Sequence, residues 1–325
     1  MTQAYLGIDI AKKSFECSLR MHGKVMHRTF GNDTEGLKEM DKWLGKHKVE
    51  QLHAGMEATN CYWEAVAQHL YKQGYQVSVV NPGRIHDYAR SKLMRNKTDK
   101  LDADVISDFC ATQQPLLWTP PPAEVSELQA LVRHLETIKA MRNQESNRLG
   151  TALHSDQVRL SIQKHVTYLD QNITQVEDLI QEHIQHHPQM KHNCDLLKSI
   201  PGISDTTAAK LLSENIQAFT STRELVAYAG LNPQQRESGT SLRGRPQLSK
   251  VGRAGLRRAL YFPAITAMRY NPLISRFCDR LAQKGKVKMV QIGAAMRKLL
   301  CLALGVLKSQ VPFDPNFSLS TQASP

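Results

Sequence analysis

The N-terminal third of the chain alternates apolar and polar residues in short stretches, which is typical of β-strands. In residues 5–10, three aliphatic side chains fall on one face and Asp9 falls on the other. Similar stretches predict four more strands, at 15–21, 25–30, 51–56 and 76–80. Capping residues and helical spacing predict helices at 32–46, 61–73 and 98–112. This order predicts an α/β domain whose first three strands form an antiparallel meander.

The pattern changes after residues 119–122, where three consecutive prolines predict a stiff linker. Beyond the linker, apolar residues recur at alternating spacings of three and four, which is typical of a coiled-coil seam. These residues are Leu128, Leu131, Leu135 and Ile138, then Ile162, Val166, Leu169, Ile173, Val176 and Ile180. The spacing fits both an internal antiparallel hairpin and a contact between two copies of the chain.

These patterns divide the chain into four parts. We expect an α/β domain at 1–122, a helical coiled-coil region at 123–190 and a mainly helical domain at 191–312. A proline-containing tail at 313–325 is expected to be disordered.

The positive charge of the chain is concentrated in its C-terminal half. The formal net charge is +12, and residues 236–298 alone hold 15 Lys/Arg against 2 Asp/Glu, a net of +13. The remainder therefore carries a net charge of −1. Such segregation indicates a surface that binds a polyanion, and we expect nucleic acid there.

The cysteines and the apolar stretches exclude several classes of protein. The 6 cysteines include no C-x-x-C pair, which argues against a zinc ribbon or a disulfide framework and fits a reducing cytoplasm. No signal-peptide pattern opens the chain. The apolar stretch at 299–307 is too short to cross a bilayer, so we expect a core helix and no membrane partner.

Four carboxylates are candidates for a metal site. Asp9 lies within an apolar strand, where an ionised carboxylate is costly without a cation or hydrogen-bond donors. Glu57 ends the fourth strand, and Asp99 and Asp102 project from one face at a helix start. If the helix packs across neighbouring strands, all four converge, and carboxylate oxygens suit Mg²⁺ or Mn²⁺. Taken singly, Asp99 also fits a favourable helix N-terminal charge, and Glu57 an ordinary strand-end acid.

A Gly/Ser/Arg-rich loop at 232–255 is the second candidate site. Its glycines permit close approach of the backbone, and its arginines supply donors for phosphate oxygens. We expect nucleic-acid contacts from seven basic residues: Arg236, Arg243, Arg245, Lys250, Arg253, Arg257 and Arg258.

A serine among arginines on such a loop can act as a nucleophile if a base or a metal takes its proton. Composition alone does not distinguish Ser238 from Ser241 or Ser249. The simpler interpretation is a flexible basic loop that binds backbone phosphates. Upstream, residues 197–212 have the pattern of a helix-hairpin-helix element, which can hold a phosphate through backbone N–H groups. Ser204 replaces the second glycine usual in that motif, so an ordinary turn between helices fits about equally well.

The order of motifs along nearly the whole chain resembles that of the insertion-sequence 110 transposases, DEDD-type recombinases related to the pilin-gene invertases. The motifs are Gly7-Ile8-Asp9-Ile10-Ala11-Lys12, Met56-Glu57-Ala58-Thr59, Arg95-Asn96-Lys97-Thr98-Asp99-Lys100-Leu101-Asp102-Ala103, Ser199-Ile200-Pro201-Gly202-Ile203, and Glu237-Ser238-Gly239 with Arg243-Gly244. The predicted strand order is also similar to that of the ribonuclease-H-like fold, which carries its acids at these element positions.

The resemblance implies a function and roles for particular residues. Asp9, Glu57, Asp99 and Asp102 would be the metal ligands of a Holliday-junction-resolvase-like domain, with Mg²⁺ or Mn²⁺ as cofactor. Ser238 would be the serine that attacks DNA and becomes transiently joined to its phosphate. The partners implied are donor and target DNA, a non-coding bridge RNA and further copies of the chain in a dimer or tetramer. The expected location is the bacterial cytoplasm, at the nucleoid.

Two other functions fit parts of the sequence. A metal-dependent nuclease or junction resolvase would hydrolyse DNA with water and use the serine loop only for binding. An actin-like kinase also carries Gly-x-Asp on its first strand, but no later Asp-x-Gly-Gly-Thr phosphate loop follows, and the basic segment has no role there. A catalytically inactive DNA-binding protein is a third, weaker reading.

Overall fold

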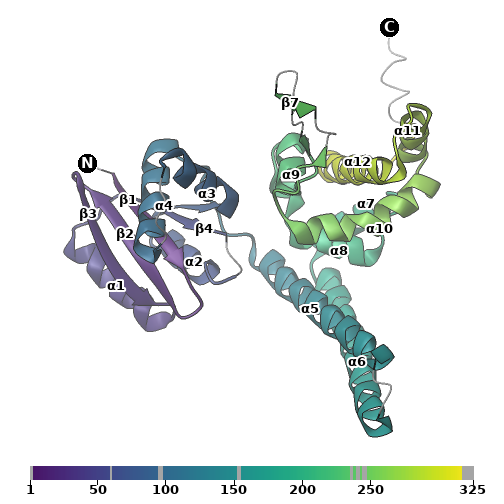
Figure 1. Cartoon of the computed structure of the whole chain (residues 1–325), viewed down its shortest axis with the longest axis horizontal. Helices are drawn as coiled ribbons and strands as arrows, with labels where there is room; N and C mark the ends of the chain where they lie inside the picture. The colour runs from purple at the N-terminus through teal and green to yellow at the C-terminus, as the bar shows by residue number, and fades with distance from the viewer. Residues whose placement is uncertain are drawn as a thin grey trace. The chain divides into compact units, whose positions relative to one another are not determined.

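The computed structural model describes residues 3–58, 61–93, 98–151, 155–234, 237–238, 242–243 and 247–316, with 237–238 and 242–243 described by their backbone alone. The chain forms two compact units, Met1–Pro120 and Pro121–Pro325. The first has a mixed α/β fold and the second is mostly helical (Figure 1). The predicted combination of an α/β domain and a mainly helical remainder is therefore confirmed.

The first unit contains a five-stranded sheet in the order β3-β2-β1-β4-β5. The strands are β1 (Ala4–Ile10), β2 (Ser14–Met21), β3 (Lys24–Gly31), β4 (Leu52–Glu57) and β5 (Gln76–Val80). The first three strands pair antiparallel, as the alternation predicted. β4 pairs parallel with β1, and β5 pairs parallel with β4. The carboxyl ends of β1, β4 and β5 therefore lie at the same end of the sheet.

Helices cover both faces of this sheet. They are α1 (Thr34–Lys46), α2 (Glu64–Lys72), α3 (Pro82–Ser91) and α4 (Asp99–Gln113). Side chains of α1 and α2 share a core with Leu6 and Ile8 of β1. The opposite face of the sheet is covered by α4, which packs with α3 through the cluster that contains Ile85 and Phe109. Helix α3 was not predicted, because no helix was expected between the strand at 76–80 and the helix at 98–112. In the structure Asn81 accepts a hydrogen bond from the Gly83 amide and caps the helix.

Helix α4 lies directly on two glycines of the sheet. Gly7 of β1 and Gly55 of β4 are partners in the register. A Cβ on Gly7 would overlap with the Ala103 carbonyl oxygen and the Ser107 amide nitrogen, and one on Gly55 would overlap with the Cys110 sulfur. The absence of a side chain at both positions therefore fixes how closely α4 approaches the sheet.

We expect Gly7→Ala to destabilise the first unit by about 1–3 kcal/mol, because the added methyl group forces α4 away from β1. Gly45→Ala is the matched control, since nothing lies within 4 Å of its added Cβ and alanine favours the helix by ~0.5–1 kcal/mol. All 3 tryptophans lie in this unit, so tryptophan fluorescence during urea unfolding reports on it alone. Equal midpoints for Gly7→Ala and the wild type would contradict the close packing.

The second unit begins with a long antiparallel helical pair, α5 (Ala123–Thr151) and α6 (Asp156–His186) (Figure 1). The predicted seam residues Leu128, Leu135, Leu169 and Val176 are buried in one cluster. Ion pairs flank the seam, from Lys139 to Glu177 at 2.6 Å and from Arg142 to Asp170 at 2.9 Å. The structure therefore shows the internal hairpin, which is one of the two predicted arrangements. A contact between copies remains a prediction.

The remaining elements share one core with the base of this hairpin. The helices are α7 (Pro188–Lys198), α8 (Asp205–Ser213), η1 (Ile216–Ala218), α9 (Thr222–Tyr228), α10 (Ala254–Tyr270), α11 (Pro272–Gln283) and α12 (Lys288–Ser309). Four two-residue strands lie between α9 and α10: β6 (Pro233–Gln234), β7 (Glu237–Ser238), β8 (Leu242–Arg243) and β9 (Gln247–Leu248).

Helix α12 is long and apolar enough to cross a membrane by composition alone, but 61% of that window is buried within the unit. It packs against α7, α10 and α11, so the apolar stretch at 299–307 belongs to a core helix, as predicted. Beyond α12, Phe313 packs on this core and its amide donates to Ser199 Oγ at 2.8 Å. The rest of the predicted tail from residue 317 lies outside the described residues.

Candidate active site

Asp9 and Glu57 lie at the ends of adjacent parallel strands. Ile8 of β1 and Met56 of β4 form the last residue pair between these two strands, and the two acids directly follow that pair. Side chains alternate across a strand, and Gly7 lies two residues before Asp9 on the face covered by α4. Glu57 bears the same relation to Gly55, so both carboxylates belong to the α4 face of the sheet, where they are partly buried.

The first turn of α4 lies at the same end of the sheet. Asp104 accepts a hydrogen bond from Ser18 of β2, and Asp108 lies 3.7 Å from Arg20, further along the same strand. Helix α4 therefore runs in the direction of β2 and against β1. Because of this direction, its N-terminal turn lies toward the carboxyl end of β1, which carries Asp9.

That first turn carries the other two predicted acids. Thr98 caps the helix by accepting from the Leu101 amide at 3.3 Å, and its carbonyl accepts from the Asp102 amide at 2.9 Å. Asp99 is exposed and Asp102 is partly buried. Across the described residues, however, no three His, Cys, Asp or Glu side chains lie close enough together to hold a metal ion. The structure thus places all four acids at one end of the sheet but does not gather them into a ligand set.

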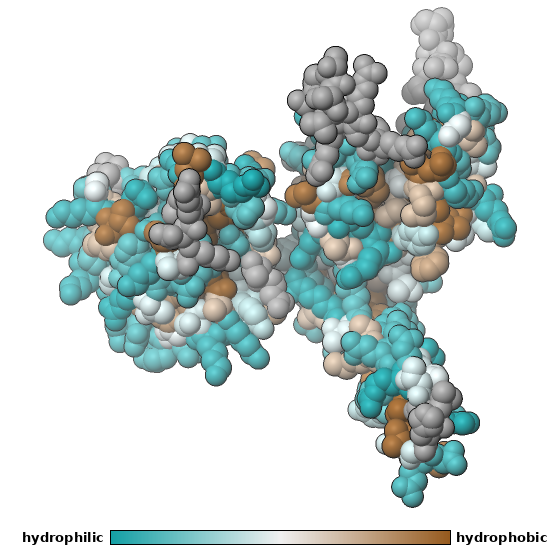
Figure 2. Space-filling model, viewed as in Figure 1, coloured by the Kyte–Doolittle hydropathy of each residue, from teal (hydrophilic) through white to brown (hydrophobic). Residues whose placement is uncertain are grey.

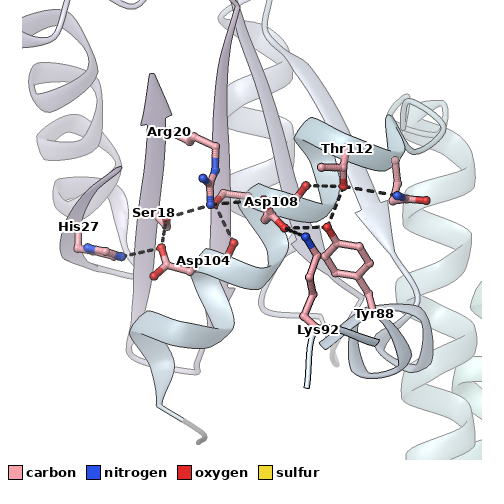
Figure 3. Close-up of polar contacts among 10 residues, drawn as sticks. Ser18, Arg20, His27, Tyr88, Lys92, Asp104, Asp108 and Thr112 are labelled. Carbon is pink, nitrogen blue, oxygen red and sulfur yellow. Dashed lines mark hydrogen bonds and ion pairs between the residues drawn. The ribbon is translucent and has the colours of Figure 1, made fainter. Parts of the chain in front are cut away.

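Two further acids of α4 hold the helix in place (Figure 3). Asp104 Oδ1 lies 2.7 Å from His27 Nε2 and accepts from Ser18 Oγ at 2.5 Å. Asp108 accepts from Tyr88 at 2.7 Å and pairs with Lys92 at 3.1 Å. These contacts join α4 to β2, β3 and α3, so they fix the direction in which its first turn points.

The pKa values of this cluster agree with its role as an internal contact. Burial by itself raises the pKa of Asp108, but the hydrogen bonds from Tyr88 and Lys92 and the charges of Lys92 and Arg20 outweigh it, and the pKa is lowered. The hydrogen bond to Asp108 raises the pKa of Lys92. This cluster was not predictable from the sequence, since Asp104 and Asp108 have the same spacing on α4 as any exposed pair four residues apart.

The serine loop, residues 232–249, is built on two short antiparallel pairs. β6 pairs with β9, and β7 pairs with β8 so that Ser238 lies opposite Leu242. The structure describes only the backbone of Ser238 and Arg243. Arg236, Arg245 and Ser241 lie outside the described residues, so the predicted roles of these side chains remain predictions.

The neck of this loop, formed by residues 228–232 and 249–253, is closely packed and joined by backbone hydrogen bonds. The amides of Ser249, Lys250 and Arg253 donate to the carbonyls of Asn232, Gly230 and Tyr228, at 2.8, 3.1 and 2.8 Å. Gly230 and Gly252 have φ values of +65° and +139°, which favour glycine. A Cβ on Gly252 would also overlap with the Tyr228 carbonyl oxygen, so both glycines are needed for this geometry.

Two of the predicted nucleic-acid ligands instead bind the neck from inside. Arg257 Nη1 donates to the carbonyls of Ala229 at 3.0 Å and Gly252 at 3.1 Å. Arg253 Nε donates to Tyr228 Oη at 3.0 Å and to Glu214 at 3.3 Å. Lys250 and Arg258, by contrast, are exposed. These basic residues could not be distinguished from the sequence, because only the tertiary structure shows which guanidinium groups have internal acceptors.

A buried ionic cluster lies behind the neck. The side chains of Lys210 and Glu214 are 8% and 5% exposed, and Lys210 Nζ lies 3.1 Å from Glu214 and 2.9 Å from Glu136 of α5. Burial raises the pKa of Glu214, but the charges of Lys210 and Arg253 and the hydrogen bonds from Lys210 and Tyr228 outweigh it, so the pKa is lowered. Burial, followed by the charge of Glu214, raises the pKa of Tyr228.

A cavity of about 440 Å³ adjoins the first strand of the loop. It is lined by Thr222, Arg223, Val226, Asn232, Pro233, Arg297 and Cys301. Two exposed guanidinium groups at such a place suit phosphate oxygens. The pairing of Arg223 with Arg297 was not predictable, since α9 and α12 are far apart in the sequence.

The hairpin turn between α7 and α8, predicted as a possible phosphate-binding element, packs against α10. A Cβ on Gly202 would lie 2.7 Å from Ala267 Cβ and 2.9 Å from the Pro263 carbonyl oxygen. This contact gives the glycine a packing role. Phosphate binding by the same turn remains a prediction.

Carboxylates at one end of the sheet fit metal-assisted chemistry, and the basic helical unit fits binding of nucleic acid, so the two units together fit an enzyme that acts on DNA. Comparison with known families agrees with this class. Residues 6–155 match a family model of transposases of the DEDD, IS110 type, and residues 194–279 match the model described as "Transposase IS116/IS110/IS902 family". The chain belongs to the IS110 family of transposases and is a DNA recombination enzyme.

Individual relatives agree. A pilin gene-inverting protein of Moraxella bovis is 35% identical over 320 residues, which cover 97% of this chain and 98% of the relative, and its Moraxella lacunata counterpart has the same identity and coverage. The transposase for insertion sequence element IS1111A of Coxiella burnetii is 23% identical over 304 residues, 82% of this chain and 78% of the relative. Among solved structures, an Aquifex aeolicus member of the Ppx/GppA family is similar over 29% of this chain and 39% of that chain, with 20% identity and a TM-score of 0.21. Family membership decides against the kinase interpretation.

Proposed function

We propose that this transposase cuts and rejoins DNA through a covalent phosphoserine intermediate on Ser238, with a divalent cation held by Asp9, Glu57, Asp99 and Asp102. The observation that carries the proposal is the placement of all four acids at one end of the sheet. The proposed fold of the first unit is ribonuclease-H-like, supported by the strand order and the match to DEDD-type transposases.

The four carboxylates offer only oxygen donors, which suits Mg²⁺ or Mn²⁺. When bound, such an ion supplies Lewis-acid stabilisation of charge on the phosphate oxygens. The chain's own residues set the position of these donors. Gly7 and Gly55 let α4 lie close to the sheet, and Asp104 and Asp108 fix its direction.

In the proposed reaction, Ser238 Oγ attacks the phosphorus of the scissile linkage while its proton passes to a base. The bond between phosphorus and one deoxyribose oxygen breaks, and that oxygen leaves as a hydroxyl group after taking up a proton. The resulting phosphoserine ester conserves the linkage until a deoxyribose hydroxyl of the other strand attacks it and releases Ser238. The backbone hydrogen bonds of the neck hold the described segments on either side of Ser238 in place, and positioning of this kind lowers the entropic cost of an attack.

The partners proposed are donor and target DNA, a bridge RNA and at least one further copy of the chain, since strand exchange needs two sites. Support comes from the family and from the net charge of +13 in residues 236–298. The Moraxella relatives are named for inverting a pilin gene, which supports a site-specific recombination reaction. We propose that the protein works at the nucleoid in the bacterial cytoplasm.

Trapping of covalent adducts tests this function. Wild-type protein is incubated with Mg²⁺ and a nicked DNA substrate that prevents rejoining, and protein joined to DNA is detected on a denaturing gel. We expect an adduct with the wild type, Ser241→Ala and Ser249→Ala, and none with Ser238→Ala. An adduct from Ser238→Ala would overturn the assignment of the nucleophile. Cleavage by the wild type without any adduct would favour hydrolysis by water.

A further inference from the structure

Helix α10 presents a stripe of basic and apolar side chains to solvent. Arg258, Phe262, Ile265 and Arg269 follow one another at spacings of four, three and four, so they share one face of the helix. Phe262 is 74% exposed and Ile265 is 39% exposed, and both arginines are exposed. The opposite face, which includes Leu260 and Ala264, is buried in the core of the unit.

Packing of the fold does not account for this stripe. Single exposed apolar residues are normal on protein surfaces, but here an aromatic and an aliphatic side chain lie between two arginines. Helix α10 contains no Asp or Glu, so every charged side chain on its exposed face is cationic. Figure 2 shows hydrophobic side chains scattered among hydrophilic ones on the visible face of this unit. A cationic face with an apolar centre complements a ligand that is anionic at its edges and aromatic in the middle.

The ring of Phe262 is supported from one side. Tyr261 meets it nearly at a right angle, with the two ring centroids 5.2 Å apart and an interplanar angle of 82°. An edge-to-face contact of this kind restricts the ring and covers at most one face of Phe262. The exposed ring is therefore partly ordered before any ligand binds, which reduces the entropic cost of stacking on it.

We propose that this stripe binds unpaired DNA, with one base stacked on Phe262 and the neighbouring backbone phosphates bound by Arg258 and Arg269. Along a helix with a rise of about 1.5 Å per residue, the arginines lie ~6 Å and ~10 Å from the phenylalanine, which matches one or two nucleotides of extended strand on either side. Stacking requires a free base face, so the site selects unpaired DNA over duplex. The proposal goes beyond the serine and the acids and depends only on DNA as the substrate.

The stripe is also connected to the serine loop. Arg257, next to Arg258, donates to the carbonyls of Ala229 and Gly252 in the neck. Helix α10 begins at Ala254, directly after that neck, so Phe262 lies about 12 Å along the helix from it. A strand separated during exchange could reach both places, and the stripe would then hold bases that have lost their partners.

Binding without cleavage tests the proposal. The full-length protein is titrated, in the absence of divalent cations, into a fluorescent single-stranded DNA of about 15 nucleotides, a duplex of the same sequence and the matching RNA. We expect Phe262→Ala to weaken binding of single-stranded DNA by about 5- to 150-fold and of duplex less than about twofold. Phe262→Trp should retain binding. Tyr168→Ala removes another exposed aromatic residue, on α6, and should leave both affinities unchanged.

Photocrosslinking gives a second readout that does not depend on affinity. Single-stranded DNA carrying 5-bromodeoxyuridine should crosslink to a peptide containing Phe262. In a separate binding measurement, the combination of Arg258→Gln and Arg269→Gln should reduce the salt dependence of the affinity. Wild-type affinity of Phe262→Ala for single-stranded DNA would overturn the proposal. So would an equal loss for duplex, a loss confined to RNA, or a change of oligomeric state that shows the stripe to be a contact between copies. A lost phosphoserine adduct would leave this test unaffected, because no cleavage is measured.

Discussion

Asp102→Asn is expected to slow DNA strand exchange by about a thousandfold or more, while the protein stays folded. Asparagine has nearly the same shape as aspartate, and the amide of residue 102 still donates to Thr98, so the helix start is preserved. The change removes one of four negative charges at the end of the sheet. In the proposed metal site, loss of one ligand removes several kcal/mol of transition-state stabilisation, and about 4 kcal/mol corresponds to a factor of roughly 10³ in rate. The measurement is the single-turnover rate of strand exchange in Mg²⁺.

Asp104→Asn is the matched control, since it removes an acid from the same helix only two residues away. Asp104 contacts Ser18 and His27 rather than the end of the sheet that carries Asp9. The asparagine oxygen at position 104 can still accept from Ser18, so α4 keeps its direction. We therefore expect a rate within about threefold of the wild type and a loss of roughly 1 kcal/mol in stability. Equal losses of rate in both variants would show that the acids act only through the placement of α4.

Metal binding can be measured separately from activity. A cation that binds only the folded protein raises its melting temperature. We expect added Mn²⁺ to raise the melting temperature of the wild type and of Asp104→Asn, but not of Asp102→Asn. A similar rise in all three proteins would place the cation elsewhere.

The strands were predictable because each has a local signal. The alternation in residues 5–10 appears in the structure as β1, with Leu6 and Ile8 facing one core and Gly7 facing α4. Helix α3 was missed because the same three residues, Asn81-Pro82-Gly83, fit both a turn and a capped helix start. The choice between them depends on Ile85, which packs with Val105 and Phe109 of α4. That contact is not visible in the local sequence.

The candidate site divides in the same way. Asp9 and Glu57 were predictable because Asp9 lies near the end of a recognisable strand and Glu57 ends another, and the spacing of Asp99 and Asp102 was visible in the sequence. Which basic residues face solvent was not predictable. Arg257 and Arg258 are neighbours, yet one binds the neck and the other is exposed, because they point to different sides of α10. Charge counts describe a surface only after the tertiary structure has removed the internally bound groups.

Lys210→Met is expected to destabilise the second unit by about 3–5 kcal/mol, the usual cost of removing one partner from a buried ion pair. Glu214 would keep only Arg253 and Tyr228 as partners, in a site where its side chain is 5% exposed. The contact between α8 and Glu136 of α5 would also be lost. This unit contains no tryptophan, so its unfolding is followed by far-ultraviolet circular dichroism, which reports mainly on helices.

The loss should depend on pH in a definite direction. The pKa of Glu214 is lowered in the folded protein, so its ion pairs contribute stability above its unfolded pKa of about 4.3, and this contribution disappears as pH falls through the folded value. The difference in unfolding free energy between wild type and Lys210→Met should therefore be largest near neutral pH and narrow below about pH 4. Lys210→Met combined with Glu214→Gln should recover much of the stability, because the buried carboxylate is removed and Arg253, whose side chain is 39% exposed, still donates to Tyr228. A loss that does not change with pH, and that the second substitution does not relieve, would show that Lys210 stabilises the unit through the packing of its aliphatic chain instead of its charge.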